Sequence, residues 1–313
     1  MRKHPPIKDY AQEFKKLIAG FHHNRNIRDV FVDWLEVAAC AIHQEPYHLG
    51  LVPRDTDFDK VEAEYMAAIK KYTKEELDVF ARLFGITKMA LWEKKTDFLG
   101  QIYMDLEISN DRSGEFFTPF EVSLMMAKML LGDISSHIQE KGFITIGEPA
   151  CGGGGMLVAA AKVIEEQGYH PGEVMFFDAT DISKACASMA YLQTSILGLS
   201  GIVRHGNSLS LEQWNSKFTP VCRAFPARTN AMIDSITATK AEKSQKHDLP
   251  TPTMPQQEQP PMQPAFMFNL EQEALDREQP KAPDRPDASS KPIRKLAQET
   301  EVDPSALEQG RLF

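Results

Sequence analysis

The sequence predicts an α/β fold, in which a parallel sheet follows an α-helical amino-terminal module and precedes a disordered carboxyl-terminal tail. Three observations lead to it: helical spacing of apolar residues early in the chain, strand–helix alternation in the middle, and enrichment in proline and polar residues at the end. With 42% apolar and 25% charged residues, the 313-residue chain has the composition of a protein with a packed core. The predicted domains are residues 1–110, 111–238 and 239–313.

Apolar residues in the first region recur at three- and four-residue spacing, which is typical of amphipathic helices. They are Phe14, Leu17, Ile18, Phe31, Leu35, Ala38, Ala39 and Ile42. Thr73 and Glu76 have the spacing of a capping box, which predicts a helix that continues to about Phe84 and stops at Gly85. The first region is therefore expected to be helical.

Short β-rich runs alternate with helical segments in the middle region. Residues 143–146, 173–177 and 201–205 predict three strands, and residues 156–167 and 184–197 predict the helices between them. Strands separated by helices of this length form βαβ units, so the sheet should be parallel.

More than half of the chain's 20 prolines lie after Thr239, mixed with Gln, Glu, Lys and Asp. Such a segment buries too little apolar surface to offset its conformational entropy, which predicts disorder over 239–313. Phe266–Leu270 and Leu312–Phe313 are short apolar exceptions.

Charge and cysteine content exclude several classes of protein. A formal net charge of −9 argues against a strongly basic nucleic-acid binder, although a local basic patch or a partner subunit can still supply phosphate contacts. The four cysteines are scattered and form no Cys-x-x-Cys pair, so neither a disulfide framework nor a metal site is expected. No apolar run suits secretion or membrane insertion, and a cytoplasmic location is expected.

The run Glu148–Gly155, Glu-Pro-Ala-Cys-Gly-Gly-Gly-Gly, joins a predicted strand to a predicted helix. Glycines permit positive φ and close backbone approach, and a helix amino terminus presents free amide groups. Such a turn can serve dinucleotides, phosphates or S-adenosylmethionine (SAM), or it can be a flexible turn without a ligand. The dinucleotide pattern Gly-x-Gly-x-x-Gly is matched only loosely, and the absence of Gly-Lys-Ser/Thr excludes a P-loop.

Polar residues close the second and third predicted strands. Asp181 can accept hydrogen bonds from ribose hydroxyls at the end of the second strand. Asp178 competes for this role, and either residue can instead cap the following helix. Asn207, in His205–Leu209, closes the third strand where the adenine of a nucleoside ligand is expected, unless this segment is a plain turn.

Together these motifs resemble the N6-adenine DNA methylases, and especially the modification subunits of type I restriction-modification systems. Glu148–Gly155 is similar to that family's Asp-Pro-Ala-Cys-Gly-x-Gly-Gly, with Glu in place of Asp. Gly114–Pro119 is similar to its Gly-x-Phe/Tyr-Phe-Thr-Pro element, about thirty residues upstream. The resemblance covers roughly residues 95–211 and implies a Rossmann-like SAM-dependent methyltransferase sheet.

The resemblance also implies ligands and partners. SAM is the expected cofactor, duplex DNA the expected substrate, and a restriction-modification subunit a candidate partner. Phe117, Thr118 and Pro119 would lie near the methionine end of SAM, and Asp181 would hold its ribose. The other expected cofactor-binding residues are Glu148, Ala150, Cys151, Gly152, Gly154 and Asn207.

One family element is missing. The resemblance implies Asn/Asp/Ser-Pro-Pro-Tyr/Phe after a fourth strand, whose aromatic ring stacks on the extruded base. Thr219–Pro220 is a poor remnant, and the first Pro-Pro pair after Asn207 is Pro260–Pro261 in the predicted tail. Residues 221–239 are too few for the remaining strands, so the sheet is expected to be truncated.

Three explanations stay open. The chain is a cofactor-binding pseudoenzyme acting through partners, or it completes its active site with another chain. Alternatively, it uses a divergent base-binding element in which Trp214 or Phe218 stacks on the base, although packing of Trp214 under a loop is favoured. The catalytic residues are therefore unassigned.

The chain ends in Gln309-Gly310-Arg311-Leu312-Phe313. This Gln-x-x-Leu-Phe form resembles the peptide by which bacterial replication and repair proteins dock on the sliding clamp. A disordered tail would keep such a peptide accessible, so a sliding clamp is a further candidate partner. An ordinary frayed terminus is the alternative.

Overall fold

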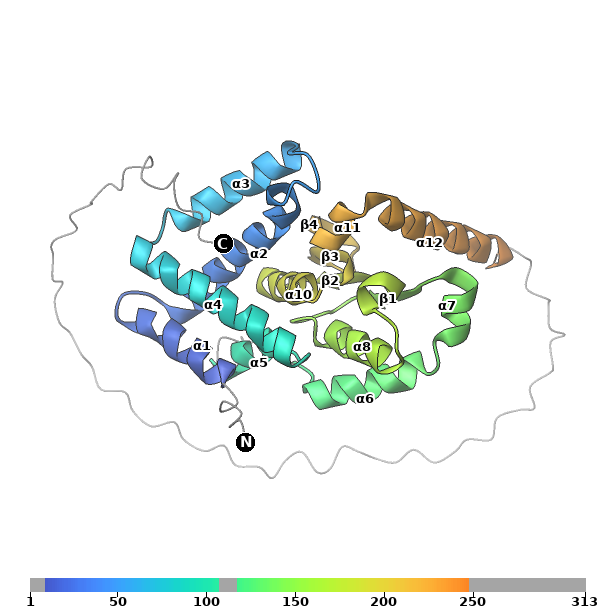
Figure 1. The fold of residues 1–313 in the computed structure, drawn as a ribbon, viewed down its shortest axis with the longest axis horizontal. Coiled ribbons are helices and arrows are strands. Elements are labelled where there is room, and N and C mark those ends of the chain that lie inside the picture. The colour runs from blue at the N-terminus through green and yellow to red at the C-terminus, as the bar shows by residue number, and fades with distance from the viewer. Residues whose placement is uncertain (1–8, 107–116, 248–313) are drawn as a thin grey trace, which may run out of the picture. The chain divides into compact units, whose positions relative to one another are not determined.

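A computed structural model describes residues 9–106 and 117–247 (Figure 1). The amino-terminal part is helical, as expected. Its helices are α1 (Tyr10–Ala19), the short 3-10 helix η1 (Gly20–His23), α2 (Ile27–His48), α3 (Thr56–Ile69), α4 (Lys74–Glu93) and α5 (Phe98–Asp105). Phe14, Phe31 and Trp34 are fully buried among them, and the Phe14 ring meets the Trp34 ring edge-on at 5.1 Å.

Helix α4 begins where the sequence predicts and ends later. The Thr73 hydroxyl accepts the Glu76 amide hydrogen and the Glu76 carboxylate accepts that of Thr73, which completes the capping box. The predicted stop at Gly85 is wrong, because α4 continues to Glu93. Ile86, Ala90 and Leu91 extend the buried face beyond Gly85, and their burial outweighs the roughly 1 kcal/mol by which glycine weakens a helix.

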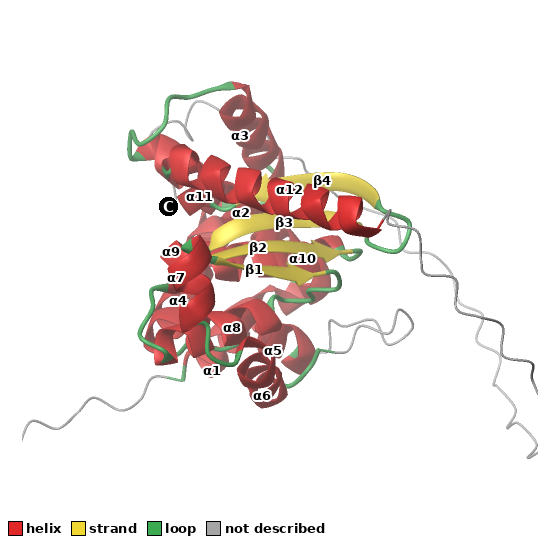
Figure 2. Ribbon diagram, turned by 90° about the vertical axis from the view of Figure 1, so that its right-hand side faces the viewer, coloured by secondary structure: helices red, strands yellow, loops and turns green. Residues whose placement is uncertain are grey.

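The middle part contains a four-stranded sheet in the order β1-β2-β3-β4 (Figure 2). Its strands are β1 (Ile144–Glu148), β2 (Met175–Asp181), β3 (Ser200–Asn207) and β4 (Glu212–Phe218). The first three are parallel, as predicted, whereas β4 pairs antiparallel with β3. The second strand starts at Met175 because Pro171 opens a short helix before it.

Helices cover both faces of this sheet. They are α6 (Phe120–Leu131), α7 (Ser135–Lys141), α8 (Gly155–Glu166), α9 (Pro171–Val174), α10 (Lys184–Ile196), α11 (Pro220–Ala224) and α12 (Pro226–His247). Phe177 of β2 is buried in the core that includes α8 and α10, while its neighbour Phe176 packs with Met232 of α12 on the other face. Alternation along β2 thus buries apolar residues on both sides.

Two further expectations need correction. Strand β4 was not expected, because its residues are polar and mostly exposed; Trp214 lies on it with 53% of its surface accessible rather than beneath a loop. Residues 239–247 belong to α12, so the predicted disorder begins too early. The rest of the predicted tail, 248–313, lies outside the described residues.

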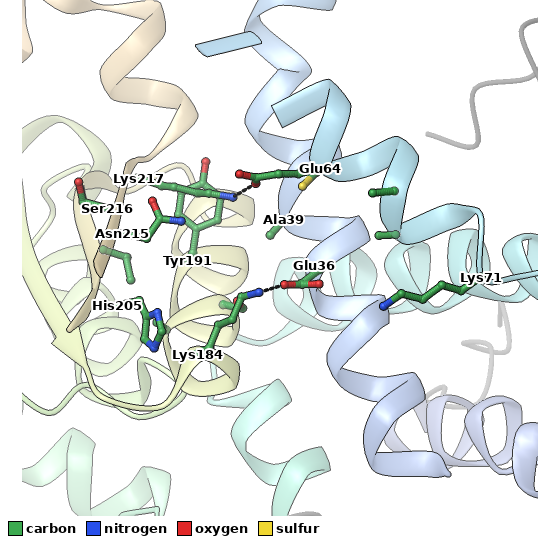
Figure 3. A pocket seen from close by; sticks show the side chains of 16 residues that line it. Glu36, Ala39, Glu64, Lys71, Lys184, Tyr191, His205, Asn215, Ser216 and Lys217 are labelled. Carbon is green, nitrogen blue, oxygen red and sulfur yellow. Dashed lines mark hydrogen bonds and ion pairs between the residues drawn. The ribbon is translucent and has the colours of Figure 1, made fainter. Parts of the chain in front are cut away.

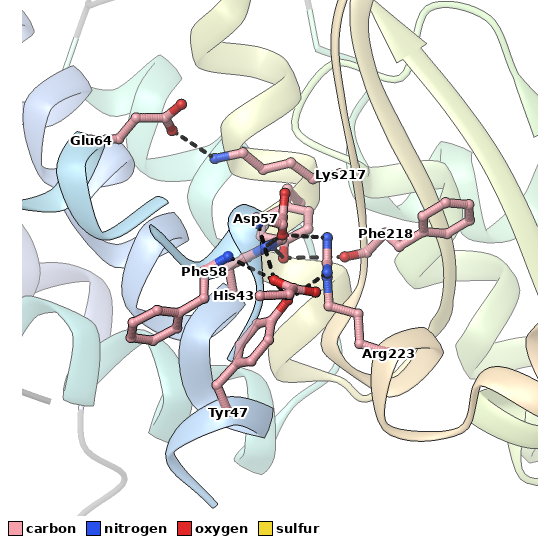
Figure 4. A network of polar contacts seen from close by, with 10 residues as sticks. His43, Tyr47, Asp57, Phe58, Glu64, Lys217, Phe218 and Arg223 are labelled. Carbon is pink, nitrogen blue, oxygen red and sulfur yellow. Dashed lines mark hydrogen bonds and ion pairs between the residues drawn. The ribbon is translucent and has the colours of Figure 1, made fainter. Parts of the chain in front are cut away.

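A polar network joins the helical part to the sheet (Figure 4). His43 of α2 contacts the Tyr191 hydroxyl of α10 through Nδ1 at 2.9 Å and the Asp57 carboxylate of α3 through Nε2 at 2.7 Å. Asp57 also pairs with Arg223 of α11 at 2.7 Å. Four helices therefore meet in one cluster of hydrogen bonds.

No helix within the described ranges is long and apolar enough to cross a membrane.

Candidate functional site

The carboxyl ends of β1, β2 and β3 bring three of the predicted segments together. The register of the parallel strands pairs Glu148 with Ala179 and Asp181 with His205, so all three strands end at the same edge of the sheet. The Cys151 amide donates to the Thr180 carbonyl at 3.0 Å, which joins the glycine turn to the end of β2. Ligands of open α/β sheets bind at such an edge.

Gly152 and Gly154 have positive φ, +51° and +90°, within the turn between β1 and α8. Space is also restricted: a Cβ on Gly152 would lie 2.7 Å from the Phe117 ring, and one on Gly154 would lie 3.1 Å from the Cα of Ala190. Both positions therefore require glycine. Gly154 is the N-cap of α8, and the free amides of the first turn make this end of the helix favourable to negative or polar groups.

Asp181 connects the end of β2 to the glycine turn. Its Oδ2 accepts the Gly152 amide hydrogen and its Oδ1 accepts that of Ser183, each at 2.8 Å. These two contacts orient the carboxylate between the glycine turn and the start of α10. Asp178, the competing acid, instead forms an ion pair with Arg204 at 2.7 Å.

Glu148 and Cys151 flank the turn. Burial, followed by the nearby charge of Asp181, raises the pKa of the half-buried Glu148 carboxyl, which accepts the Ala150 amide hydrogen at 3.4 Å. Burial raises the pKa of the Cys151 thiol well above its ordinary value, which disfavours the thiolate form at this position.

Asn207 ends β3 beside the same turn. Its side-chain oxygen accepts the amide hydrogens of Leu209 at 2.9 Å and Ser210 at 3.3 Å, an Asx-turn that leaves its amide nitrogen as the group available to a ligand. The neighbouring Ser208 hydroxyl donates to the Pro149 carbonyl at 2.7 Å, which ties the loop after β3 to the glycine turn.

Phe117 also meets the turn, since its ring lies against Gly152 and edge-on to Tyr103 at 5.6 Å. Thr118 and Pro119 are exposed and lead into α6. Gly114–Phe116, the start of this predicted element, lies outside the described residues.

Sequence reasoning missed a buried pair that supports the turn from behind. The Gln193 amide nitrogen donates to Asp97 Oδ1 at 2.8 Å and to the Gly153 carbonyl at 2.7 Å. Asp97 also caps α5 by accepting the Gly100 amide hydrogen at 3.0 Å. Cβ atoms on Gly100, Gly153 or Gly155 would lie between 2.2 and 3.1 Å from the Asp97 carboxylate, so these glycines admit its side chain.

The sequence contains one signal for this pair. Asp97 precedes Gly100 by three residues, which is the spacing between a capping side chain and the amide that it accepts from. Gln193, 96 residues further along the chain, carried no local signal.

A separate cavity of about 380 Å³ lies between α2, α3, α10 and the strands β3 and β4 (Figure 3). Lys217 pairs with Glu64 across it at 3.6 Å, and Lys184 pairs with Glu36. None of the predicted cofactor-binding residues lines this cavity, so it is distinct from the edge at the glycine turn.

The donors at the edge suit an organic cofactor better than a metal. Within residues 9–106 and 117–247, no group of three His, Cys, Asp or Glu side chains could hold a metal ion. The side-chain-free backbone at Gly152 and Gly154 and the oriented Asp181 carboxylate fit a nucleoside with vicinal hydroxyls. SAM has such a nucleoside, so the residues present are compatible with it.

The family model described as N-6 DNA Methylase matches residues 94–258, more than half of the chain and all of the sheet. The search of curated proteins returned no match. A solved structure from Listeria monocytogenes, provisionally described as a class I SAM-dependent methyltransferase, is 16% identical, with a TM-score of 0.29 over 62% of this chain and 52% of that one. The chain thus spans about half of that structure's length.

The family model spans both Asp97, behind the glycine turn, and the three strand ends that form the edge. The chain therefore belongs to the N-6 DNA methylase family, whose cofactor is SAM.

Proposed function

We propose that this chain is the SAM-binding component of a DNA adenine-N6 methylation activity, with the cofactor held at the carboxyl ends of β1, β2 and β3. The observation that carries the proposal is the contact between the Asp181 carboxylate and the Gly152 amide, which joins an acceptor for ribose hydroxyls to the glycine turn.

Each predicted residue has a role in this proposal. Asp181 would hold the ribose, and the amide nitrogen of Asn207 would meet the adenine ring. The backbone of Ala150, Cys151, Gly152 and Gly154 would line the cofactor, with the Glu148 carboxylate nearby. Phe117, Thr118 and Pro119 would border the methionine end, where the Phe117 ring already covers Gly152.

SAM supplies an electrophilic methyl group on a sulfonium. The chain's contribution is to bind and orient it, because transfer to a neutral amino group is largely a matter of positioning. DNA is proposed as the substrate on the strength of the family. The target adenine must leave the duplex to reach the cofactor.

The aromatic alternatives for base stacking fit poorly. Trp214 lies on β4, which is separated from β1 and the Phe117 end of the turn by two strands. Phe218 packs with Phe176 and Cys222, and the buried Thr219 hydroxyl donates to the Leu199 carbonyl. These observations do not support a base-stacking role for Trp214 or Phe218.

A second candidate function follows from the strand order. β1 pairs only with β2 within the described chain, and no described strand is followed by the Pro-Pro-aromatic element that the resemblance implies. This favours a SAM-binding subunit that needs another chain for transfer, or one that acts without transfer. A restriction-modification subunit is the partner that the resemblance implies.

The sliding clamp stays a separate prediction, because Gln309–Phe313 lies outside the described residues.

The first test is calorimetric titration of the full chain with SAM. We expect Asp181→Ala to weaken binding by about tenfold or more, since one well-placed charged hydrogen bond contributes about 1.5–3 kcal/mol. Asp178→Ala is the matched control on the same strand and should bind like wild type. Absence of binding at millimolar SAM, or equal loss in both variants, would exclude the proposed site.

The second test follows labelled methyl transfer to adenine in duplex DNA. Transfer by the purified chain would identify a complete enzyme. Binding without transfer would instead support the second candidate, in which another chain is required or no transfer occurs.

A further inference from the structure

The cavity between α2, α3, α10, β3 and β4 has a wall of small side chains (Figure 3). Ala39, Ala68, Ala187 and Val203 line it and are buried. Because these side chains are short, the helices and strands leave about 380 Å³ of space between them. This volume lies in the range of small-molecule sites, which combine mostly apolar walls with a few polar groups.

The charged groups of the lining are already balanced. Each of its three lysines has a carboxylate partner, in the pairs Lys71–Asp33, Lys184–Glu36 and Lys217–Glu64. Burial raises the pKa of the Cys40 thiol to about 11, which keeps this wall residue neutral near neutral pH. An anionic ligand would have to displace a carboxylate from a lysine, so the lining favours an uncharged ligand.

Three polar side chains of the lining have no hydrogen-bond partner within residues 9–106 and 117–247. They are Ser188 of α10, His205 of β3 and Asn215 of β4. The register places His205 directly opposite Asn215, so their side chains lie on the same face of the sheet. Figure 3 shows both on the strand side of the cavity. Polar groups that converge on a largely apolar cavity are those that orient a bound molecule.

We propose that this cavity is a second ligand site, which binds a neutral adenine nucleoside. The Asn215 amide offers a donor and an acceptor side by side, the pattern that matches N7 and the 6-amino group of adenine. The His205 ring supplies an aromatic face for the base, and the alanine wall admits a planar ring. Ser188 is left to meet a ribose hydroxyl. None of the proposed SAM-binding residues lines the cavity, so this site is additional to the proposed function.

Calorimetric titration of the full chain with adenosine, in the presence of saturating SAM, tests the site. We expect Asn215→Ala to weaken adenosine binding by about tenfold or more, which is the discrimination of one bidentate Asn–adenine contact. Gln213→Ala is the matched control, because it removes an amide from the same strand outside the lining. It should bind adenosine like wild type. No adenosine binding, or equal binding by wild type and Asn215→Ala, would overturn the proposal.

Two further ligands test the chemistry of recognition. Inosine has no 6-amino group, so we expect it to bind wild type about tenfold more weakly than adenosine. Adenosine monophosphate should bind no more tightly than adenosine, because each lysine of the lining is paired. Equal affinity for inosine and adenosine would reject adenine recognition by Asn215. Tighter binding of the monophosphate would reject a site for a neutral ligand.

Adenosine is also part of SAM, so the titration is repeated without SAM on Asp181→Ala. We expect this variant to bind adenosine as wild type does with SAM present. Loss of adenosine binding in Asp181→Ala, together with its retention in Asn215→Ala, would place adenosine at the glycine turn and reject the cavity. If SAM itself does not bind, the Asp181→Ala titration still tests the cavity. The two proposals therefore fail separately.

Discussion

At the scale of single residues, packing around the Asp97 side chain explains why two of the four residues Gly152–Gly155 are glycine. Gly152 and Gly154 have positive φ, but Gly153 and Gly155 do not. These two are instead restricted by the Asp97 carboxylate, which Gln193 anchors. Half of the four-glycine run thus serves the packing of α5 against the turn, and half serves the turn's own conformation.

We predict that Asp97→Asn is tolerated and Asp97→Leu is not. Burial raises the pKa of the Asp97 carboxyl, so wild-type stability falls as pH rises from about 3.9, the unfolded value, through the raised folded value. Asparagine keeps an oxygen for Gly100 and Gln193 and removes this pH-dependent loss. Leucine leaves both donors unpaired, at a cost of about 2–4 kcal/mol.

Urea unfolding of both variants near neutral pH measures this difference. Equal destabilisation by Asn and Leu would show that the carboxylate charge, rather than its acceptor oxygens, holds the turn.

At the scale of elements, α4 shows how burial overrides a local stop signal. Gly85 has helical geometry, is exposed, and has no atom within 4 Å of an added Cβ. Packing therefore does not require glycine at position 85, whereas the backbone freedom of glycine weakens the helix.

Gly85→Ala should stabilise the protein by about 0.5–1 kcal/mol, the difference in helix propensity between the two residues. Thermal unfolding measures it. Gly154→Ala is the contrasting variant, because a φ of +90° and the backbone of Ala190 at 3.1 Å make the same change destabilising. A lower melting temperature for Gly85→Ala would contradict this account of α4.

At the scale of the whole molecule, the His43 network couples the helical part to the sheet. Burial lowers the pKa of His43, which keeps its imidazole neutral between Tyr191 and Asp57. The hydrogen bond from His43 in turn lowers the pKa of Asp57 to about 2. Both shifts favour the protonation states found near neutral pH.

Stability should therefore fall on acidification in two stages. The unfolded chain protonates histidine below about pH 6.5 while folded His43 resists it, so stability declines there. A second loss follows as pH falls from about 4 toward the folded pKa of Asp57, about 2. Urea unfolding at several pH values measures both stages.

His43→Gln should flatten the first stage, while His22→Gln, on the exposed surface of η1, should keep it. An unchanged slope for His43→Gln would assign the pH dependence to other groups.

What the sequence alone determined about this protein is local. Apolar periodicity placed β1, α8, β2, α10 and β3, because each pattern depends on neighbours within a few residues. The glycine run and Asp181 could likewise be proposed as candidates, because a strand-to-helix turn and an acid at a strand end are marked by residues close together in the sequence.

Only the tertiary structure decided the features that depend on distant partners. Polar β4 becomes a strand because β3 offers an edge to pair with. Helix α4 continues past Gly85 because its second half is buried against a core formed by other helices. Asp97 meets Gln193, and β1 lies at the edge of the sheet, through contacts among segments far apart in the chain. No short stretch of sequence carries a signal for these arrangements, because contacts between distant segments of the assembled fold stabilise them.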